Sequence, residues 1–410
     1  MTTTAKPLRS AVLPIQASDL RGLTRLGFEA TVGLTDLVEA MHHTIASRAG
    51  VLGRAPAGRT SGITGGVYRA IRGTTRVLGQ GMDALLGAVT PAASADASTK
   101  EHEAVVAALN GVRGDHLADS GNPLAITMAM RIKGRALDLS GASLAAQLPE
   151  ARGRLLVLAH GLCMSDLQWA RHGHDHGQEL ARDLGFTPVY LHYNSGRHVS
   201  QSGRDFAALL DRLVTLWPVP VDELVIVGHS MGGLVARSAC HLAAQDGQAW
   251  LGLLTKLVFL GTPHHGAPLE RGGHRLDRAL GISPYVAPFS RLGKARSAGI
   301  TDLRYGNIQD ADWHGRDRHS QRHDDRRPTP LPAGVDAYLL AATTAERAGG
   351  VHGAVIGDGL VPLASALGEH RNPALALKVP KTHSRIVTSC NHLDLLSRDD
   401  VAAQLRAWLE

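Results

Sequence analysis

Strand-like and helix-like segments alternate along the chain from about residue 125 onwards. Short apolar runs bounded by turn residues predict buried strands, and apolar residues spaced three and four apart predict amphipathic helices. Because the first two predicted strands form an antiparallel pair and the others alternate with helices, we expect right-handed crossovers and a mostly parallel sheet flanked by helices. The predicted strands are 125–133, 135–139, 154–159, 187–191, 224–227, 256–260, 335–342 and 375–379, and the predicted helices are 101–109, 178–184, 204–217, 233–237 and 399–409.

Residues 1–95 have a different pattern, with two long helix-like stretches separated by a break. Apolar residues three and four apart run from 20 to 45, after the candidate N-cap Ser18, and again from 63 to 89. This segment holds ten Lys or Arg and five Asp or Glu, so it carries most of the net positive charge. We expect an amphipathic helical segment. Three interpretations stay open: packing on its own chain, self-association, or contact with a lipid or polymer surface.

Composition narrows the class of protein. Hydrophobic residues make up 44% and charged residues 20% of the 410 residues, which is typical of a globular chain with a sizeable core. The formal net charge of +6 is scattered among acidic residues without an aromatic–basic signature, so we expect no nucleic-acid partner. Three cysteines without paired spacing, and the lack of an apolar signal core or membrane-length stretch, predict a cytoplasmic protein.

The stretch Gly228-His229-Ser230-Met231-Gly232 lies between a predicted strand and a predicted helix. A serine between two glycines at such a junction is the nucleophile-elbow pattern, in which the glycines allow close backbone approach and a strained turn lifts the hydroxyl above the strand ends. A plain structural turn is the alternative for so short a pattern. The flanking strand and helix favour the elbow, with Ser230 as the nucleophile.

A serine nucleophile needs a base to take its proton and an acid to orient that base. In an α/β hydrolase the acid and then the base follow the serine along the chain. The candidate acid is Asp358, in a glycine-rich turn after the predicted strand 335–342, although Asp-Gly is also a common turn dipeptide. Asp336 is less suitable because it precedes its strand.

The candidate base is His392, which lies between the last predicted strand and the C-terminal helix. The chain has 22 histidines, so position has to discriminate among them. His383, nearer to the strand end, is the main rival, while His352 and His370 flank the acid turn.

An oxyanion hole needs two backbone N–H groups aimed at the developing negative charge. One is expected from Met231, the residue after the nucleophile, and the other from Leu162, in the loop that begins His160-Gly161 after the predicted strand 154–159. We expect the neighbouring Cys163 to serve packing rather than catalysis.

Two histidine-rich stretches invite a metal interpretation. They are 172–176, with alternating imidazoles, and the pair His264-His265. Neither matches a standard zinc spacing, so we expect loop hydrogen bonding or a place at the rim of the site, with no cofactor and no metal.

The insertion at 266–334 lies between the predicted strands 256–260 and 335–342, and 310–327 is dense in Arg, Asp and His. A loop of this length in a compact domain is usually functional or disordered. Since it follows a strand on the elbow side of the sheet, we expect a lid or cap. The predicted organisation is therefore an N-terminal helical segment, 1–95, and an α/β-hydrolase domain, 96–410.

With these residues assembled, the chain from about residue 123 resembles bacterial lipases and esterases of the α/β-hydrolase superfamily, including the branch similar to GPI-inositol deacylases. Besides the elbow, the resemblance rests on five blocks: His160-Gly161-Leu162, Tyr193-Asn194-Ser195-Gly196, Leu260-Gly261-Thr262-Pro263-His264-His265-Gly266, Gly357-Asp358-Gly359-Leu360-Val361-Pro362 and Asn391-His392-Leu393-Asp394. It implies Ser230, Asp358 and His392 as the triad. Some lipases with a similar His-x-Asp segment bind calcium through that Asp, here Asp394, but no second acidic ligand is identified.

The predicted function is a serine carboxylic-ester hydrolase that acts on a hydrophobic acyl ester through an acyl-enzyme. An acyltransferase or a polyester depolymerase using the same triad is the alternative within enzymes. From another class, the alternative is a surface-binding or scaffold protein with a vestigial hydrolase fold.

Overall fold

The computed structural model describes residues 100–267, 297–316, 324–347 and 357–410, together with a few isolated positions between 21 and 80. The chain divides into two compact units, one formed by Met1–Asp96 with Gly121–Leu124 and the other by Ala97–Ser120 with Ala125–Glu410. Apart from those isolated positions, the predicted N-terminal helices lie outside the described residues. So does the first part of the predicted insertion.

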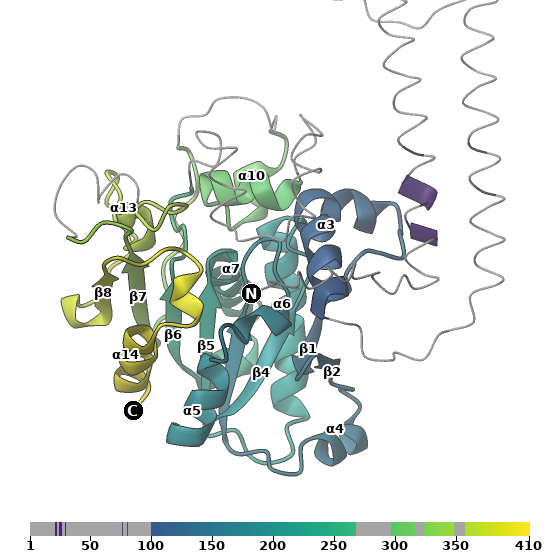
Figure 1. Ribbon diagram of the computed structural model, residues 1–410, viewed down its shortest axis with the longest axis horizontal. Coiled ribbons are helices and arrows are strands. Elements are labelled where there is room, and N and C mark those ends of the chain that lie inside the picture. The colour runs from purple at the N-terminus through teal and green to yellow at the C-terminus, as the bar shows by residue number, and fades with distance from the viewer. Residues whose placement is uncertain are drawn as a thin grey trace, which may run out of the picture. The chain divides into compact units, whose positions relative to one another are not determined.

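The second unit is built on an eight-stranded sheet in the order β2-β1-β4-β3-β5-β6-β7-β8 (Figure 1). β1 pairs antiparallel with both β2 and β4, and all other neighbours are parallel. This confirms the mostly parallel sheet and the antiparallel pair predicted from the sequence. The strands are β1 (Ala129–Ile132), β2 (Arg135–Ala136), β3 (Arg154–Ala159), β4 (Thr187–His192), β5 (Glu223–His229), β6 (Leu254–Leu260), β7 (Asp336–Ala342) and β8 (Ser384–Val387).

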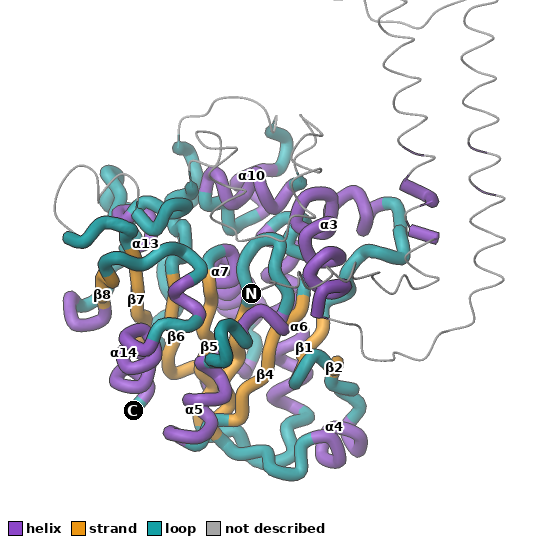
Figure 2. Tube along the Cα trace, in the orientation of Figure 1, coloured by secondary structure: helices purple, strands orange, loops and turns teal. Residues whose placement is uncertain are grey.

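Helices cover both faces of this sheet (Figure 2). In β3, Leu155, Val157 and Ala159 join one hydrophobic cluster, which includes residues of α6 and α7, while Leu156 and Leu158 join a second cluster with α5 and α14. A strand buried on both faces reads as a continuous apolar run, which is why 154–159 was recognisable. The helices are α3 (Lys100–Asp119), α4 (Gly141–Gln147), α5 (His176–Leu184), α6 (Val199–Thr215), α7 (Met231–Asp246), α10 (Ala298–Tyr305), α11 (Asp310–Trp313), α13 (Leu363–Ala366) and α14 (Asp399–Leu409).

The predicted strand 375–379 is wrong. The segment is a loop, and the last strand of the sheet is β8. Leu377 and Val379 alternate as in a strand because they pack from this loop against the first hydrophobic cluster. Pro373 and Pro380 bracket the segment and limit its ladder hydrogen bonds. β8 was missed because it is an edge strand of only four residues, of which just one is fully buried.

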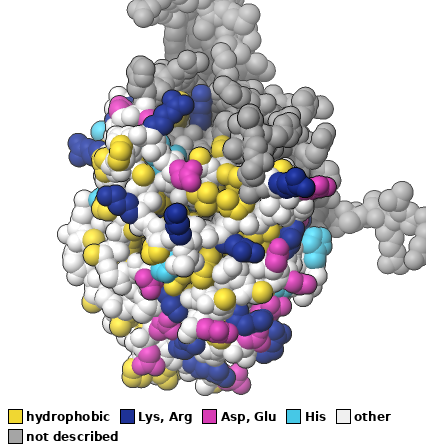
Figure 3. All heavy atoms as spheres, turned by 90° about the vertical axis from the view of Figure 1, so that its left-hand side faces the viewer, with side chains coloured by type: hydrophobic (Ala, Val, Ile, Leu, Met, Phe, Trp, Pro, Cys, Tyr) yellow, Lys and Arg dark blue, Asp and Glu magenta, His cyan; other side chains and the backbone are white. Residues whose placement is uncertain are grey.

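Charges are mixed on the surface next to β8 and α14. Figure 3 shows Lys and Arg side chains interspersed with Asp and Glu on this face. One pair, Arg406 Nη2 with Asp183 Oδ2 at 2.6 Å, links α14 to α5. Since exposed ion pairs contribute only about 0–1 kcal/mol each, the two hydrophobic clusters, rather than these pairs, hold the helices on the sheet. Among the residues that the structure describes, no helix is both long and apolar enough to span a bilayer.

Candidate active site

Ser230 lies at the junction of β5 and α7 in a strained backbone conformation. Its φ of 54° and ψ of −122° place a non-glycine residue where few L-residues are found. A Cβ on Gly232 would stand 2.2 Å from the carbonyl oxygen of Ala159, and one on Gly228 would stand 2.5 Å from the Cα of Gly233. The two glycines are therefore required by close backbone contact. The strand, the strained turn and the helix all agree with the elbow expected from the sequence.

Asp358 and His392 form a short buried pair. Their side chains are almost fully buried, and His392 Nδ1 lies 2.6 Å from Asp358 Oδ2. Asp358 Oδ1 accepts the backbone N–H groups of Leu360 at 2.9 Å and Val361 at 2.8 Å. The His392 backbone N–H donates to the Asp358 carbonyl at 3.1 Å. Three hydrogen bonds thus fix the carboxylate, and the histidine is held at both its backbone and its ring.

This pair lies beside the elbow. His229, the residue before Ser230, has its Nε2 atom 3.1 Å from the His392 carbonyl oxygen, and the two rings are 4.7 Å apart. The Ser230 N–H donates to Leu260, and a Cβ on the next residue, Gly261, would stand 3.2 Å from both Asp358 Oδ2 and His392 Cε1. The sequence-predicted nucleophile, acid and base are therefore brought together at the carboxyl ends of the strands.

The Ser230–His392 hydrogen bond is not formed in this structure. Within the described residues, His392 Nε2 is buried and has no hydrogen-bond partner. Such bonds are often long in free enzymes and tighten when substrate binds. His392 Nδ1 faces the carboxylate, so its proton belongs there, and Nε2 retains the lone pair that a general base needs.

The rival residues lie elsewhere. Asp336 is the exposed first residue of β7, at the amino end of the sheet. His383 ends the short 3₁₀ helix Lys381–His383 just before β8, and its ring stacks on Tyr338 at 4.2 Å. His370 Nε2 pairs with Asp324 at 3.0 Å. His352 lies outside the described residues.

The loop after β3 lies against Ser230. A Cβ on Gly161 would stand 3.1 Å from Ser230 Cβ. Neither the Leu162 nor the Met231 backbone N–H donates to another atom of the described chain. Met231 is the first residue of α7, and a backbone N–H group in the first turn of a helix has no acceptor within that helix. The two predicted oxyanion donors are therefore both unpaired and lie on segments that flank Ser230.

Two side chains of the segment after β4 hold this loop on either side of Leu162. The Tyr193 hydroxyl donates to the His160 carbonyl at 2.9 Å, and Ser195 Oγ accepts the Cys163 N–H at 3.0 Å. The His160 ring stacks on Tyr193 at 4.4 Å, and burial lowers its pKa to about 3, so the ring is neutral. The roles of Tyr193 and Ser195 were not predicted from the sequence, where the only signal was the block Tyr193-Asn194-Ser195-Gly196 directly after a strand.

Cys163 and the histidine-rich stretch have structural surroundings. Burial raises the pKa of the Cys163 thiol to about 12, which leaves no thiolate at neutral pH. In the stretch 172–176, His174 Nε2 lies 2.7 Å from His176 Nδ1, and His176 Nε2 lies 2.9 Å from the Leu395 carbonyl. These contacts connect α5 to the segment that follows His392.

The described part of the predicted lid packs on α6. Asp302 of α10 lies 2.9 Å from His198 Nδ1 and accepts the Val199 N–H at 2.8 Å, and the His198 ring stacks on Trp313 of α11 at 3.6 Å. A Cβ on Gly299 would stand 3.0 Å from Met231 Cε. α10 therefore lies next to the elbow, above the strand ends (Figure 1). Whether the full insertion acts as a lid stays a prediction.

Residues 150–314 match the model of a family described as a PGAP1-like alpha/beta domain. A comparison with curated proteins finds no match. Among solved structures, the mature form of Bacillus licheniformis lipase BlEst2 is 17% identical, with a TM-score of 0.40, 62% of this chain covered and 91% of that chain. A lipase-esterase related protein from Clostridium acetobutylicum is 12% identical, with a TM-score of 0.36 and coverages of 63% and 95%. A Pyrococcus furiosus esterase is 14% identical, with a TM-score of 0.37 and coverages of 63% and 80%. Residues 150–314 are therefore similar to a PGAP1-like α/β domain, and the mostly parallel sheet flanked by helices is arranged as in the α/β hydrolases, as the sequence motifs predicted.

Proposed function

We propose that the protein is a serine carboxylic-ester hydrolase. Ser230 Oγ attacks the acyl carbonyl carbon while His392 Nε2 takes the hydroxyl proton, and the carbonyl electron pair moves onto oxygen. The backbone N–H groups of Leu162 and Met231 stabilise this oxyanion. Collapse of the intermediate expels the alcohol, which receives the proton from His392, and leaves an acyl-enzyme on Ser230. Water then attacks with His392 again as base, which releases the acid and restores the serine.

The observation that carries the proposal is the buried Asp358–His392 pair beside a strained serine. The 2.6 Å contact with a carboxylate fixes the ring and stabilises the imidazolium that forms during attack. Ser230 keeps its unfavourable φ because the residues around it fix the turn, as is common at functional sites. A structural turn alone would need neither the strain nor the buried carboxylate–imidazole pair beside it.

An apolar acyl group suits the surroundings of this serine. Leu162, Met164 and Met231, on the segments that flank Ser230, are all buried. α10 adds the half-buried Ile300, which packs against the same hydrophobic cluster as Leu162 and Met231. A hydrophobic acyl ester is therefore the substrate class that we propose.

The test is hydrolysis of nitrophenyl esters with short, medium and long acyl chains by the wild type and by Ser230→Ala, with fluorophosphonate labelling of the same samples. We expect hydrolysis and labelling in the wild type and neither in Ser230→Ala. Ser143→Ala, on α4 away from the strand ends, is the matched control and should retain both. Equal hydrolysis by wild type and Ser230→Ala would refute the mechanism.

A further inference from the structure

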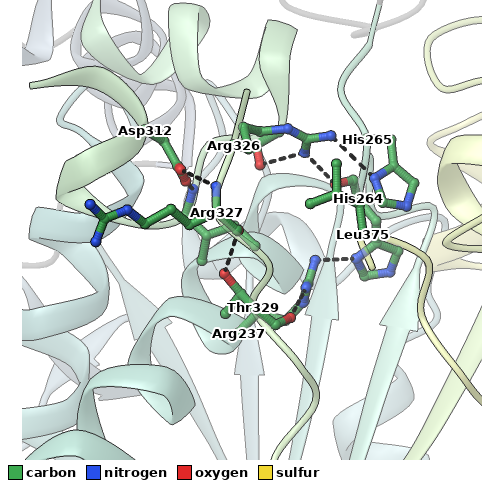
Figure 4. Close-up of a pocket in the computed structure, with 10 residues that line it drawn as sticks. Arg237, His264, His265, Asp312, Arg326, Arg327, Thr329 and Leu375 are labelled. Carbon is green, nitrogen blue, oxygen red and sulfur yellow. Dashed lines mark hydrogen bonds between the residues drawn. The ribbon is translucent and has the colours of Figure 1, made fainter. Parts of the chain in front are cut away.

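A polar pocket lies beside α7, and none of the triad residues lines it. Its walls come from Arg237 on α7, the loop after β6 with His264 and His265, and the segment of Arg326 and Thr329 (Figure 4). It has about 260 Å³ of space, including its open mouth. The proposed ester hydrolysis uses none of these side chains, so their arrangement needs an explanation of its own.

Arg326 is fully engaged within the protein. Its Nη1 donates to the carbonyl oxygens of His264 and Gly306, both at 3.0 Å. Its Nε and Nη2 bind the two oxygens of Asp324 at 2.8 and 2.7 Å, and Nη2 also donates to His265 Nδ1 at 3.3 Å. All five N–H groups of this guanidinium therefore have an acceptor, and a carboxylate balances its charge.

Arg237 is buried as a cation without a carboxylate. Only 5% of the residue is exposed, and it makes two hydrogen bonds: Nη2 to the Thr329 carbonyl at 2.7 Å and Nη1 to His264 Nδ1 at 3.3 Å. Its buried Nε has no partner in the described chain. Burial and the nearby Arg326 lower its pKa to about 9, so it remains protonated at neutral pH. Buried charges are normally paired, and this one forms no ion pair within the described residues.

The carboxylate that lines the same pocket is committed elsewhere. Asp312 Oδ2 accepts the backbone N–H groups of Ile308 at 2.9 Å and Gln309 at 3.0 Å. Its Oδ1 accepts the Arg327 N–H at 3.2 Å. Asp312 forms no ion pair with Arg237 in the described structure. Its charge acts on the Arg237 pKa only from a distance, in the upward direction.

His264 accepts a hydrogen bond from Arg237 and fixes the position of its guanidinium. Arg237 always donates, so His264 Nδ1 must accept its hydrogen bond, and the ring proton then lies on Nε2. This Nε2–H is buried and has no hydrogen-bond partner among the described residues. Burial and the adjacent Arg237 hold the His264 pKa well below its usual value, so the ring is neutral. His264 therefore orients the Arg237 guanidinium and adds no charge to the pocket.

We propose that this pocket binds a small free oxyanion of phosphate size, held by the Arg237 guanidinium, whose position the hydrogen bond to His264 Nδ1 fixes. A guanidinium presents parallel N–H groups that match two oxygens of one oxyanion, which favours phosphate over a spherical ion such as chloride. The modest volume favours a free anion over a large ligand. Anion binding would join α7 to the loop after β6 and supply the counter-charge that Arg237 lacks.

The experiment is calorimetric titration of sodium phosphate into the full-length protein at neutral pH and constant ionic strength, with sodium chloride as the parallel titrant. We expect saturable binding of one phosphate per chain and weaker binding of chloride. The free energy of a hydrogen bond to a charged group corresponds to a factor of about 10 to 150 in affinity. We expect Arg237→Gln to lose this factor in phosphate affinity. Arg327→Gln is the matched control: it removes the same charge from an exposed position at the same pocket and should change affinity less than about threefold.

Binding is measured independently of ester hydrolysis, so the outcome does not depend on the proposed function. If Arg237→Gln does not fold, His264→Phe replaces it. That variant keeps an aromatic ring against Phe259, which His264 contacts edge-on at 4.7 Å, but removes the acceptor that positions Arg237 Nη1, and it should weaken phosphate binding. Non-saturable binding to the wild type would overturn the proposal, as would equal losses in Arg237→Gln and Arg327→Gln.

Discussion

Replacing Asp358 by Asn should disable His392 as a base while leaving the fold intact. The two side chains have the same shape, but the amide has only one acceptor oxygen. Asp358 Oδ1 accepts two backbone N–H groups, at 2.9 and 2.8 Å, and an amide nitrogen in that place would face two donors. The Asn oxygen will therefore take that position, and its nitrogen will face His392 Nδ1. The ring proton must then move to Nε2, where it blocks acceptance of the Ser230 proton.

The expected loss of kcat follows from the free energy that the opposite orientation of the new amide group would cost. That orientation would leave two buried backbone N–H groups unsatisfied, at about 1–3 kcal/mol each. A total of about 2–6 kcal/mol corresponds to a rate reduction of about 30-fold to 10⁴-fold. The upper end agrees with the loss of about 10⁴ in kcat known for this substitution in a Ser-His-Asp triad.

The assay is kcat for the best nitrophenyl ester, measured together with thermal unfolding of the same preparation. Asp358→Asn should unfold close to the wild-type temperature but turn over far more slowly. Asp336→Asn, at the exposed amino end of β7, should retain wild-type kcat. A value of kcat for Asp358→Asn within about threefold of the wild type would refute the assignment of the acid.

Three further predictions concern the loop after β3, the elbow helix and a buried histidine. Tyr193→Phe removes the hydrogen bond to the His160 carbonyl, and kcat should fall by up to about tenfold with KM unchanged. An equal rise in KM would contradict a role of Tyr193 in positioning the loop. Gly232→Ala should lower the free energy of unfolding by about 1–3 kcal/mol, because the new Cβ would overlap the Ala159 carbonyl. Denaturant titration measures this, and Gly252→Ala, where a Cβ has no neighbour within 4 Å, should leave the free energy of unfolding nearly unchanged. Burial lowers the His176 pKa from 6.5 to about 4. As the pH falls, the imidazole therefore takes up a proton in the unfolded chain before it does so in the folded protein. The free energy of unfolding should fall by about 3 kcal/mol between about pH 6.5 and pH 4. His176→Gln should flatten this part of the unfolding profile, and an unchanged slope would argue against a buried neutral imidazole.

The elements that were predicted well are those whose own residues determine them. The strand 154–159 and the helix 399–409 match β3 and α14 residue for residue, because one is a continuous apolar run and the other a regular amphipathic pattern. The helix predicted at 204–217 in fact begins at Val199. Its first turn, rich in Ser and Gly, is a poor helix former, and the Val199 N–H is instead accepted by Asp302, more than a hundred residues away. A start that depends on so distant a residue has no local signal.

The same distinction separates the triad from the arginine pocket. Ser230 directly follows β5, Asp358 lies in a glycine-rich turn of the segment after β7, and His392 lies in the segment after β8. The parallel sheet brings these segments to one edge. Arg237 lies inside a helix, and within the described residues its Nε has no acceptor and its charge has no carboxylate partner. Arg326 is of the same residue type and lies in the same pocket, yet its five N–H groups are all engaged. Only the three-dimensional distribution of acceptors separates a structural arginine from one available to an anion, so a binding site of this kind has no sequence pattern to reveal it.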